Sequence, residues 1–161
     1  CMKGDSDFVR LLIDKGADVK HTIPLQGVTA LHFCGVNNNE GSAACARAVI
    51  NAGADINAKT SVDPHHCKTS LMIAAERCNT DCVMALIEAG ADLEATNDQD
   101  ETALYLAVRQ ERFDSVKTLV EAGAVISPIL PAEAPEFCGN KEIIAYLEEK
   151  VAALPVPPAL E

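Results

Sequence analysis

Apolar residues recur along the chain at the spacing of an amphipathic helix, in four separate segments. Within each segment they occupy positions i, i+3 and i+4, which lie on one face of a helix. Each segment is therefore predicted to be a helix that packs this face against a core. The four sets are Val9, Leu12 and Ile13; Ala46, Val49 and Ile50; Val83, Leu86 and Ile87; and Val116, Leu119 and Val120.

A second series of shorter helices is predicted between these segments, with the same spacing but smaller side chains. Small residues on a helix face allow a neighbouring helix to approach closely. The chain is therefore expected to form pairs of packed helices. The three sets of this series are Leu31, Cys34 and Gly35; Leu71, Ala74 and Ala75; and Leu104, Ala107 and Val108.

The junctions between the helices recur as well. A glycine followed by alanine comes after each longer segment, and Thr-x-Leu opens each shorter one. Glycine adopts the left-handed conformation that ends many helices, and a threonine hydroxyl can cap a first turn. The polar connection between them is expected to project as a turn or hairpin. The glycines are Gly16, Gly53, Gly90 and Gly123, and the threonines are Thr29, Thr69 and Thr102.

The junctions are separated by a fixed period. Thr69 and Thr102 lie 33 residues apart, and so do Gly90 and Gly123. Self-similarity at such a period is typical of a stacked repeat array. The unit before them is longer, with extra residues around 37–41 and 60–63. Insertions of this kind in an array often serve recognition.

Two pairs of segments carry a family resemblance. GVTALHF (27–33) with VINAGADINA (49–58), and KTSLMIAAERC (68–78) with ALIEAGADLEA (85–95), resemble ankyrin repeats over about residues 1–150. The resemblance implies an all-α, mainly helical solenoid. Each unit of it has a β-hairpin finger followed by two antiparallel helices, and the fingers and first helices line up into one concave surface.

The chain departs from the family pattern at three positions of the unit. These substitutions are expected to lower local stability at the hairpin tips without changing the fold. The family's proline after the threonine is replaced by Ala30, Ser70 and Ala103. Its following histidine is kept as His32 and replaced by Met72 and Tyr105. Its turn glycine is kept as Gly27 and replaced by Cys67 and Asp100.

The expected organisation is a single domain over residues 1–150. It comprises a partial repeat (1–23), repeats 24–63, 64–96 and 97–126, a degenerate C-terminal cap (127–150), and a disordered proline-rich tail (151–161). The start matches the middle of a unit, so a fragment of a longer array is expected. In the cap, Ile144 and Leu147 keep the apolar stripe, while Glu148 gives the polar outer face that a terminal unit needs.

Composition narrows the classes of partner. The formal net charge is −11, which argues against a nucleic acid because phosphate binding needs clustered Lys and Arg. No apolar run approaches the ~18 residues of a membrane span. The seven cysteines include no CxxC pair, which favours reduced thiols in the cytoplasm or nucleus. A monomer that binds a protein partner, one with a basic segment, is expected.

Three short clusters contain residue types that occur in metal sites or as reactive thiols. PHHCK (64–68) contains possible zinc ligands, but adjacent residues of an extended segment point in opposite directions, so a projecting fingertip is favoured. NDQDET (97–102) lacks the glycine and the distant glutamate of a calcium loop, which favours an acidic fingertip. Cys67, beside His66 and Lys68, is the expected exposed thiol. No nucleotide-binding loop or serine-nucleophile motif occurs, so neither an enzyme nor a cofactor is predicted.

Several other polar residues are expected to be solvated or to bond within the protein. Glu76, Asp81, Glu101 and Asp114 are expected to be solvated carboxylates. Asn57 stands where the family can be hydroxylated on asparagine, although an asparagine that bonds backbone in a turn is the favoured alternative.

The leading hypothesis is a non-catalytic module that binds a protein on the concave surface. The alternatives are a regulatory or substrate-recruiting domain of a larger enzyme or channel, and a thiol- or metal-responsive sensor. By the resemblance, the partner-binding residues are Gln26, Val28, Val36, Asn37, His65, His66, Lys68, Glu76, Arg77, Asp98, Gln99, Glu101, Arg109 and Gln110.

Overall fold

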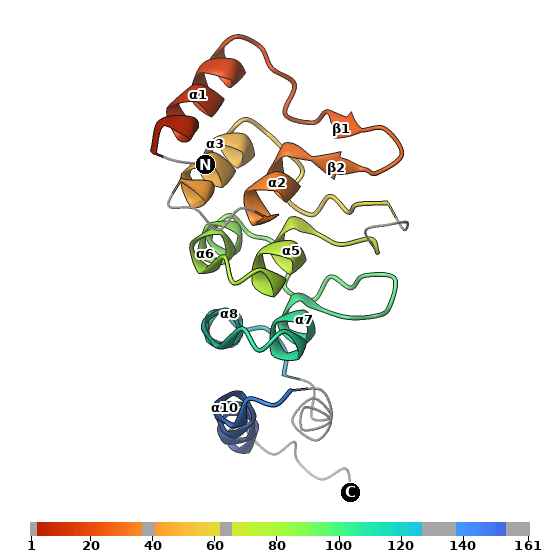
Figure 1. Ribbon diagram of the computed structural model, residues 1–161, viewed down its shortest axis with the longest axis vertical. Coiled ribbons are helices and arrows are strands. Elements are labelled where there is room, and N and C mark those ends of the chain that lie inside the picture. Colours follow the sequence, from red (N-terminus) through yellow and green to blue (C-terminus); the bar gives the residue numbers. More distant parts are fainter. Residues whose placement is uncertain (1–2, 37–40, 62–65, 127–137, 154–161) are drawn as a thin grey trace, which may run out of the picture.

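The fold is a stack of helix pairs with a loop projecting from each, seen in a computed structural model (Figure 1). The structure describes residues 3–36, 41–61, 66–126 and 138–153. The elements are α1 (Lys3–Asp14), β1 (Thr22–Ile23), β2 (Val28–Thr29), α2 (Ala30–Val36), α3 (Ser42–Asn51), α5 (Ser70–Glu76), α6 (Thr80–Glu88), α7 (Ala103–Arg109), α8 (Phe113–Glu121) and α10 (Lys141–Ala152).

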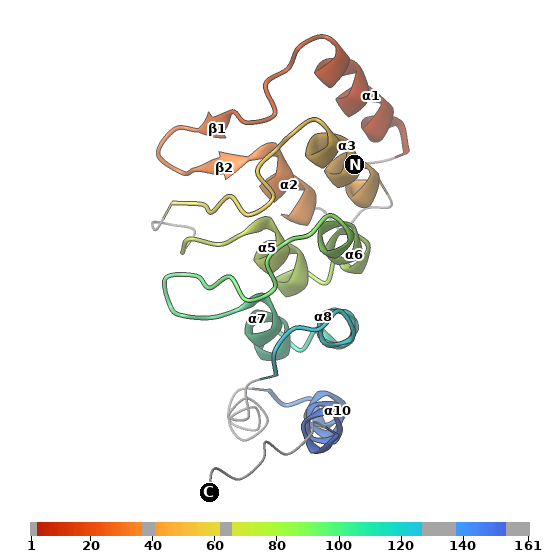
Figure 2. The ribbon, with the colours of Figure 1, turned by 180° about the vertical axis from the view of Figure 1, so that it is seen from behind.

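The helices form two columns, which both views show (Figures 1 and 2). The inner helices, α2, α5 and α7, lie beside the projecting loops, and consecutive members are in contact. The outer helices are α1, α3, α6, α8 and α10, and they too contact one another in chain order. Each inner helix also packs against the outer helix that follows it in the chain. The predicted helical solenoid is therefore confirmed.

The predicted apolar stripes form the core between the two columns. Leu31, Leu71 and Leu104 of the inner helices are at most 1% exposed. The outer stripe of α1 differs, because Leu12 is 44% exposed. Among the described residues no inner helix lies beside α1 as α2 lies beside α3, so one side of this stripe is uncovered.

Helix ends follow the predicted chemistry at the four glycines and at two of the threonines. Gly53 and its three counterparts have φ between +86° and +97°, the left-handed region that costs glycine little. The hydroxyls of Thr69 and Thr102 cap α5 and α7 by accepting the amides of Met72 and Tyr105. The hydroxyl of Thr29 lies 2.8 Å from Nδ1 of His32.

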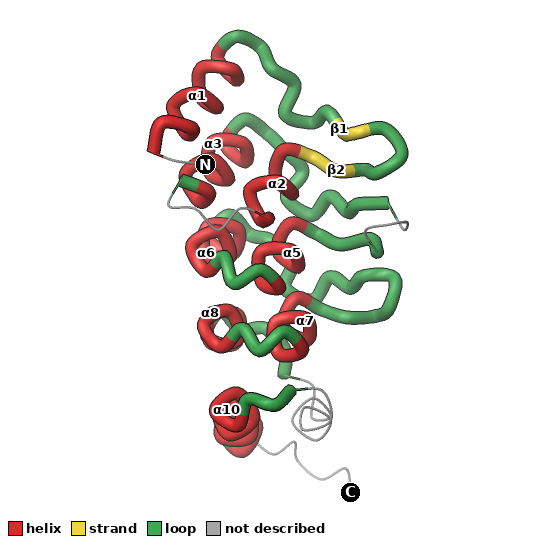
Figure 3. The backbone as a smooth tube through the Cα atoms, in the orientation of Figure 1, coloured by secondary structure: helices red, strands yellow, loops and turns green. Residues whose placement is uncertain are grey.

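Three projecting loops, hereafter the fingers, extend to the same side of the stack (Figures 1 and 3). Finger 1 (residues 17–29) is a hairpin in which β1 and β2 pair antiparallel, with Ile23 opposite Val28. The described part of finger 2 (residues 54–61 and 66–68) has one bridge, which pairs Lys59 with Thr69 just after the finger. Finger 3 (residues 91–101) is closed by the side chain of Asn97, which accepts the amides of Gln99 and Glu101. The expected hairpin is thus fully formed in finger 1 alone among the described fingers.

The finger tips retain the left-handed turn where the family glycine is replaced. Cys67 and Asp100 have φ of +53° and +59°, close to the +62° of Gly27 in the equivalent position. A side chain in this region costs roughly 1–2 kcal/mol, less for Asp than for most residues. The fold therefore tolerates strain at these turns.

Replacing Cys67 with glycine is expected to raise the free energy of unfolding by about 0.5–1 kcal/mol, since the relieved strain exceeds the extra chain entropy of glycine. Urea unfolding followed by circular dichroism measures the change. Cys67→Ser is the matched control, because it removes the thiol and keeps the strain. A gain in Cys67→Ser equal to that in Cys67→Gly would contradict the explanation.

The last described outer helix, α10, packs against α8. Asn140 caps α10, and Ile143 and Leu147 are fully buried. Tyr146 meets Phe113 of α8 edge to face at 5.7 Å between ring centroids. Glu148 is exposed, as a polar terminal face requires. The helix runs to Ala152, past the expected start of the tail; the proline-rich first half of the cap and residues 154–161 lie outside the described residues.

Candidate functional site

The fingers and the solvent sides of α2, α5 and α7 border one continuous surface, hereafter the inner face (Figure 2). Seven of the predicted binding residues are exposed on it, three are partly buried, two are buried, and two lie outside the described residues. The exposed ones are Gln26, Val36, His66, Arg77, Asp98, Gln99 and Gln110; the partly buried ones are Lys68, Glu76 and Arg109; the buried ones are Val28 and Glu101; and Asn37 and His65 are not described.

Two of these residues are less accessible than the sequence suggested. Val28 is 9% exposed, because its strand pairs with β1. Glu101 is also 9% exposed, and the expectation of a solvated carboxylate is wrong. Asn97 donates to Oε2 of Glu101 at 2.8 Å, and Arg109 donates to Oε1. Glu101 therefore stabilises finger 3 and presents little of itself to a partner.

An equivalent pair of positions recurs along the inner face with different chemistry in each unit. The first position of the pair is the residue before Thr29, Thr69 or Thr102. The second is at the C-terminal end of the inner helix that follows. Lys68 and Glu76 form an ion pair with 2.7 Å between Nζ and Oε2, and in the next unit Glu101 and Arg109 pair with the signs reversed. In the first unit the same positions hold Val28 and Val36. Glu76, expected to be solvated, is thus partly buried and paired.

The first unit has a hollow of about 130 Å³ where the other units have an ion pair. It opens between finger 1, finger 2, α2 and α5. Its lining residues are Gln26, Val28, His32, Phe33, Val36, Thr60 and Ile73.

The polar groups at the base of this hollow are bonded within the protein. Nδ1 of His32 accepts the amide of Thr29, so its proton lies on Nε2, which donates to the carbonyl of Lys68 at 3.2 Å. The hydroxyl of Thr60 accepts the amide of Lys68. These bonds join finger 2 to α2. They also leave the hollow walls mainly apolar.

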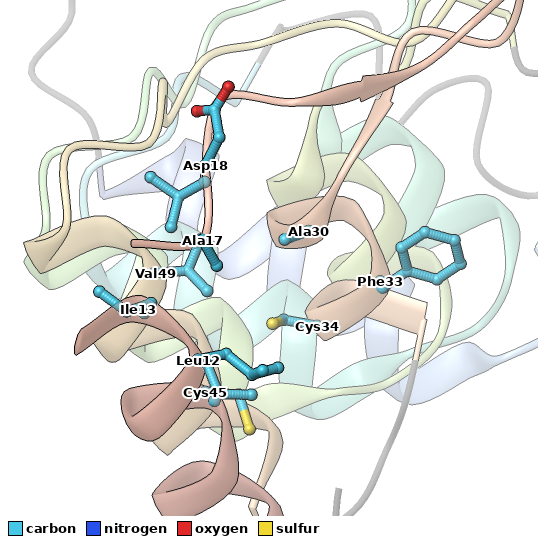
Figure 4. Close-up of a pocket in the computed structure, with 11 residues that line it drawn as sticks. Leu12, Ile13, Ala17, Asp18, Ala30, Phe33, Cys34, Cys45 and Val49 are labelled. Atoms are coloured by element: carbon cyan, nitrogen blue, oxygen red, sulfur yellow. The ribbon is translucent and has the colours of Figure 1, made fainter. Parts of the chain in front are cut away.

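A second hollow of about 300 Å³ lies between α1, α2 and α3 (Figure 4). Leu12, Ile13 and the thiols of Cys34 and Cys45 border it. In the next unit the corresponding space between α3, α5 and α6 is occupied by α2, which contacts all three. Phe33 also lines this hollow, and its ring points away from Cys34 and Cys45 (Figure 4).

The described residues of the two clusters singled out in the sequence, PHHCK (64–68) and NDQDET (97–102), make polar contacts within the protein. Nδ1 of His66 lies 3.4 Å from Oδ2 of Asp98, which links fingers 2 and 3. The side chain of Asn97 is used by the backbone of its own finger. Within the described residues, no group of three or more His, Cys, Asp or Glu side chains is arranged to hold a metal ion. Nor does any described helix combine the length and apolarity needed to cross a membrane.

Asn57 bonds backbone, as the favoured interpretation holds. Its Oδ1 accepts the amide of Asp92 at 3.0 Å, so the bond joins finger 2 to finger 3 rather than closing one turn. Lys59 adds a second link between these fingers through the carbonyl of Thr96.

The six described cysteines form no disulfide, and Cys34, Cys45 and Cys82 lie together in the core. Burial raises the pKa of Cys34 to about 12, with smaller contributions from the neighbouring Cys82 and Cys45. Burial likewise raises the pKa of Cys82 to about 12, against the attraction of Arg47. These two thiols remain protonated at neutral pH. Cys67 is partly exposed and the better candidate for modification.

The free energy of unfolding is expected to fall as the pH rises from about 9 to about 12. Unfolded thiols lose their protons above pH 9.0, while the buried thiols hold theirs up to about pH 12. Each of the two costs up to about 1.4 kcal/mol per pH unit in this window and nothing below it. Urea unfolding at several pH values measures the slope. Cys34→Ala with Cys82→Ala should flatten it, and an unchanged slope would contradict the assignment.

One buried residue that joins two units was not singled out from the sequence. Asn79 is 1% exposed and caps α6 by accepting the amide of Cys82. It also accepts the hydroxyl of Ser42 and donates to the carbonyl of Cys34, so one side chain connects α2, α3 and α6. An asparagine just before an apolar segment is a capping signal that could have indicated the first of these bonds.

Comparison with known protein families gives two matches. The family described as "Ankyrin repeats (3 copies)" matches residues 59–128, and the family described as "Ankyrin repeat" matches residues 26–61. Together they run from finger 1 to the end of α8 and include the whole described inner face from Gln26 onward. No curated protein sequence matches the chain.

Proposed function

The chain belongs to the ankyrin-repeat family, whose repeats are generally protein–protein interaction modules, and we propose that it is a non-catalytic module that binds a protein partner on the inner face. The partner contacts the fingers through a basic segment, because the chain has a net charge of −11 that attracts cations. The binding unit is a monomer. The absence of a disulfide among its six described cysteines favours a reducing compartment, the cytoplasm or the nucleus.

The observation that carries this proposal is a contrast between two sets of equivalent positions. Positions that face the core keep apolar residues in every unit, and one of them is leucine throughout, as Leu31, Leu71 and Leu104. Positions on the inner face change from unit to unit, which suits a surface that recognises one non-repeating partner. Three inner-face series show the change: Gln26, His66 and Gln99; Val28, Lys68 and Glu101; and Val36, Glu76 and Arg109.

Affinity capture from a lysate of the source cells tests the proposal. The inner-face variant carries Arg77→Ala, Asp98→Ala and Gln110→Ala, three exposed positions. Arg109 is left intact, because its removal would leave the buried carboxylate of Glu101 unpaired and destabilise finger 3.

The matched control carries the same number of substitutions on outer helices, namely Met84→Ala, Glu88→Ala and Lys117→Ala, all exposed. Circular dichroism and thermal unfolding establish that both variants fold as the wild type does. The expected result is a protein retained by the wild type and the outer-helix variant and lost from the inner-face variant. Retention by all three, or loss from the outer-helix variant alone, would contradict the proposal.

A further inference from the structure

We propose that the hollow of the first unit is an anchor pocket for one large apolar side chain of the partner, and that a Lys or Arg further along the same partner segment lies against the carboxylates of Asp98 and Asp100 in finger 3. This inference rests on the proposed function and adds the chemistry of the partner. The partner is an extended protein segment that crosses the inner face from α2 toward α7.

The size and walls of the hollow suit an apolar guest. Its volume is about 130 Å³. Apolar cavities of roughly 150 Å³ in proteins accept a benzene ring. Val28 and Ile73 contribute aliphatic walls, while His32 and Thr60 already bond within the protein. A polar guest would lose its water and gain no free partner from these two groups, so an aliphatic or aromatic side chain is favoured.

The hollow occurs in the first unit because the recurring pair of positions is occupied there by two valines, Val28 and Val36. Lys68 with Glu76, and Glu101 with Arg109, place an ion pair across these positions in the next two units. Val28 and Val36 make no such bridge. Within the described inner face, a partner can therefore bury an apolar group at this pair of positions in the first unit and not in the next two, which fixes its register.

Exposed apolar side chains surround the hollow on the same unit. Phe33 and Val36 on α2 both line the hollow and are 50% and 44% exposed. Contiguous apolar surface of this kind marks interaction sites in soluble proteins. Covering it removes apolar area from water and supplies the main free energy of binding at this end.

The charges along the inner face determine which way the segment runs. At finger 3, Asp100 is exposed, and the side chain of Asp98 is 25% exposed with Nδ1 of His66 at 3.4 Å from its Oδ2. In the middle unit, Lys68 and Glu76 neutralise each other, and the exposed Arg77 repels a cation. A basic side chain is therefore attracted to finger 3, away from the apolar anchor.

Selection of random peptides displayed on phage, with the wild-type chain as the immobilised target, tests this inference. The selected peptides should share a large aliphatic or aromatic residue and a Lys or Arg at a fixed distance on one side of it. Their affinities are then measured by isothermal titration calorimetry against the wild type, four single variants that form two matched pairs, and the inner-face variants Arg77→Ala and Gln110→Ala.

Four of the variants form the two matched pairs. Val36→Gln puts an amide at the hollow and should weaken binding at least about tenfold, whereas Met84→Gln, at a side chain with the same 44% exposure on α6, should leave it unchanged. Asp100→Asn removes a charge and keeps a residue that tolerates the left-handed turn. It should weaken binding several-fold at low salt and less at high salt, whereas Glu148→Gln on α10 should have no effect.

The outcomes separate this inference from the proposed function. Peptides that lose binding with Arg77→Ala and Gln110→Ala, but lack an apolar residue or ignore Val36→Gln, would overturn the anchor and leave inner-face binding intact. Peptides insensitive to every inner-face change would overturn both. A selection that yields no binder also overturns the anchor, since a preformed pocket should be selectable by short peptides.

Discussion

Replacing Asn79 with alanine is expected to lower the free energy of unfolding by about 3 kcal/mol. The substitution removes the cap of α6 and, at the same time, the two bonds to Ser42 and to the carbonyl of Cys34. Loss of an N-cap costs about 1 kcal/mol, and each buried group left without a partner costs roughly 1–3 kcal/mol. The effect is large because one side chain connects two units.

A second capping asparagine provides the control. Asn140 caps α10 by accepting the amides of Glu142 and Ile143, and both bonds stay within its own helix. Asn140→Ala should therefore cost only about 1 kcal/mol. Urea unfolding of the two variants followed by circular dichroism measures both changes. Equal losses would show that the bonds of Asn79 to the first unit contribute nothing.

Replacing Gly35 with valine is also expected to cost about 3 kcal/mol, at the upper end for overpacking a core. A Cβ added to Gly35 would lie 2.9 Å from the carbonyl oxygen of Ser70 and 3.3 Å from the amide nitrogen of Ala74. Both are backbone atoms of α5, so neither can rotate away. The inner helices would have to separate, and the stack between the first and second units would loosen.

A substitution at Gly53 is the control that separates the cost of lacking space from the cost of an unfavourable backbone conformation. It has φ of +89°, and a Cβ there would meet nothing within 4 Å. Gly53→Ala should therefore cost only the conformational strain of roughly 1–2 kcal/mol. Thermal and urea unfolding of both variants measure the difference. Wild-type stability in Gly35→Val would contradict the close contact of α2 with α5.

The repeated features of the fold could be predicted from the sequence, because local chemistry determines them. Apolar spacing identified both helix columns, and glycines at +86° to +97° end the outer helices as expected. Thr69 and Thr102 cap the helices that follow them. The hydroxyl of Thr29 lies 2.8 Å from Nδ1 of His32, a contact that helix-capping chemistry alone did not indicate.

The site was less predictable, because its features depend on pairs of residues. Glu101 is a fingertip carboxylate by position, but Asn97 and Arg109 bury it. Lys68 and Glu76 look like independent charges until the finger is placed beside α5. Phe33 and Ile73 line the hollow of the first unit, yet their helical spacing alone is equally typical of a core. A comparison of residues at equivalent positions in successive units would have indicated both ion pairs.

Amide hydrogen exchange of the chain alone and with its captured partner tests inner-face binding most directly. Binding at this face should slow exchange in the fingers and inner helices, within residues 26–36, 66–77 and 98–110, and leave α3, α6 and α8 unchanged. Protection confined to the outer helices, with the fingers exchanging as in the free chain, would contradict the assignment of the inner face as the binding surface.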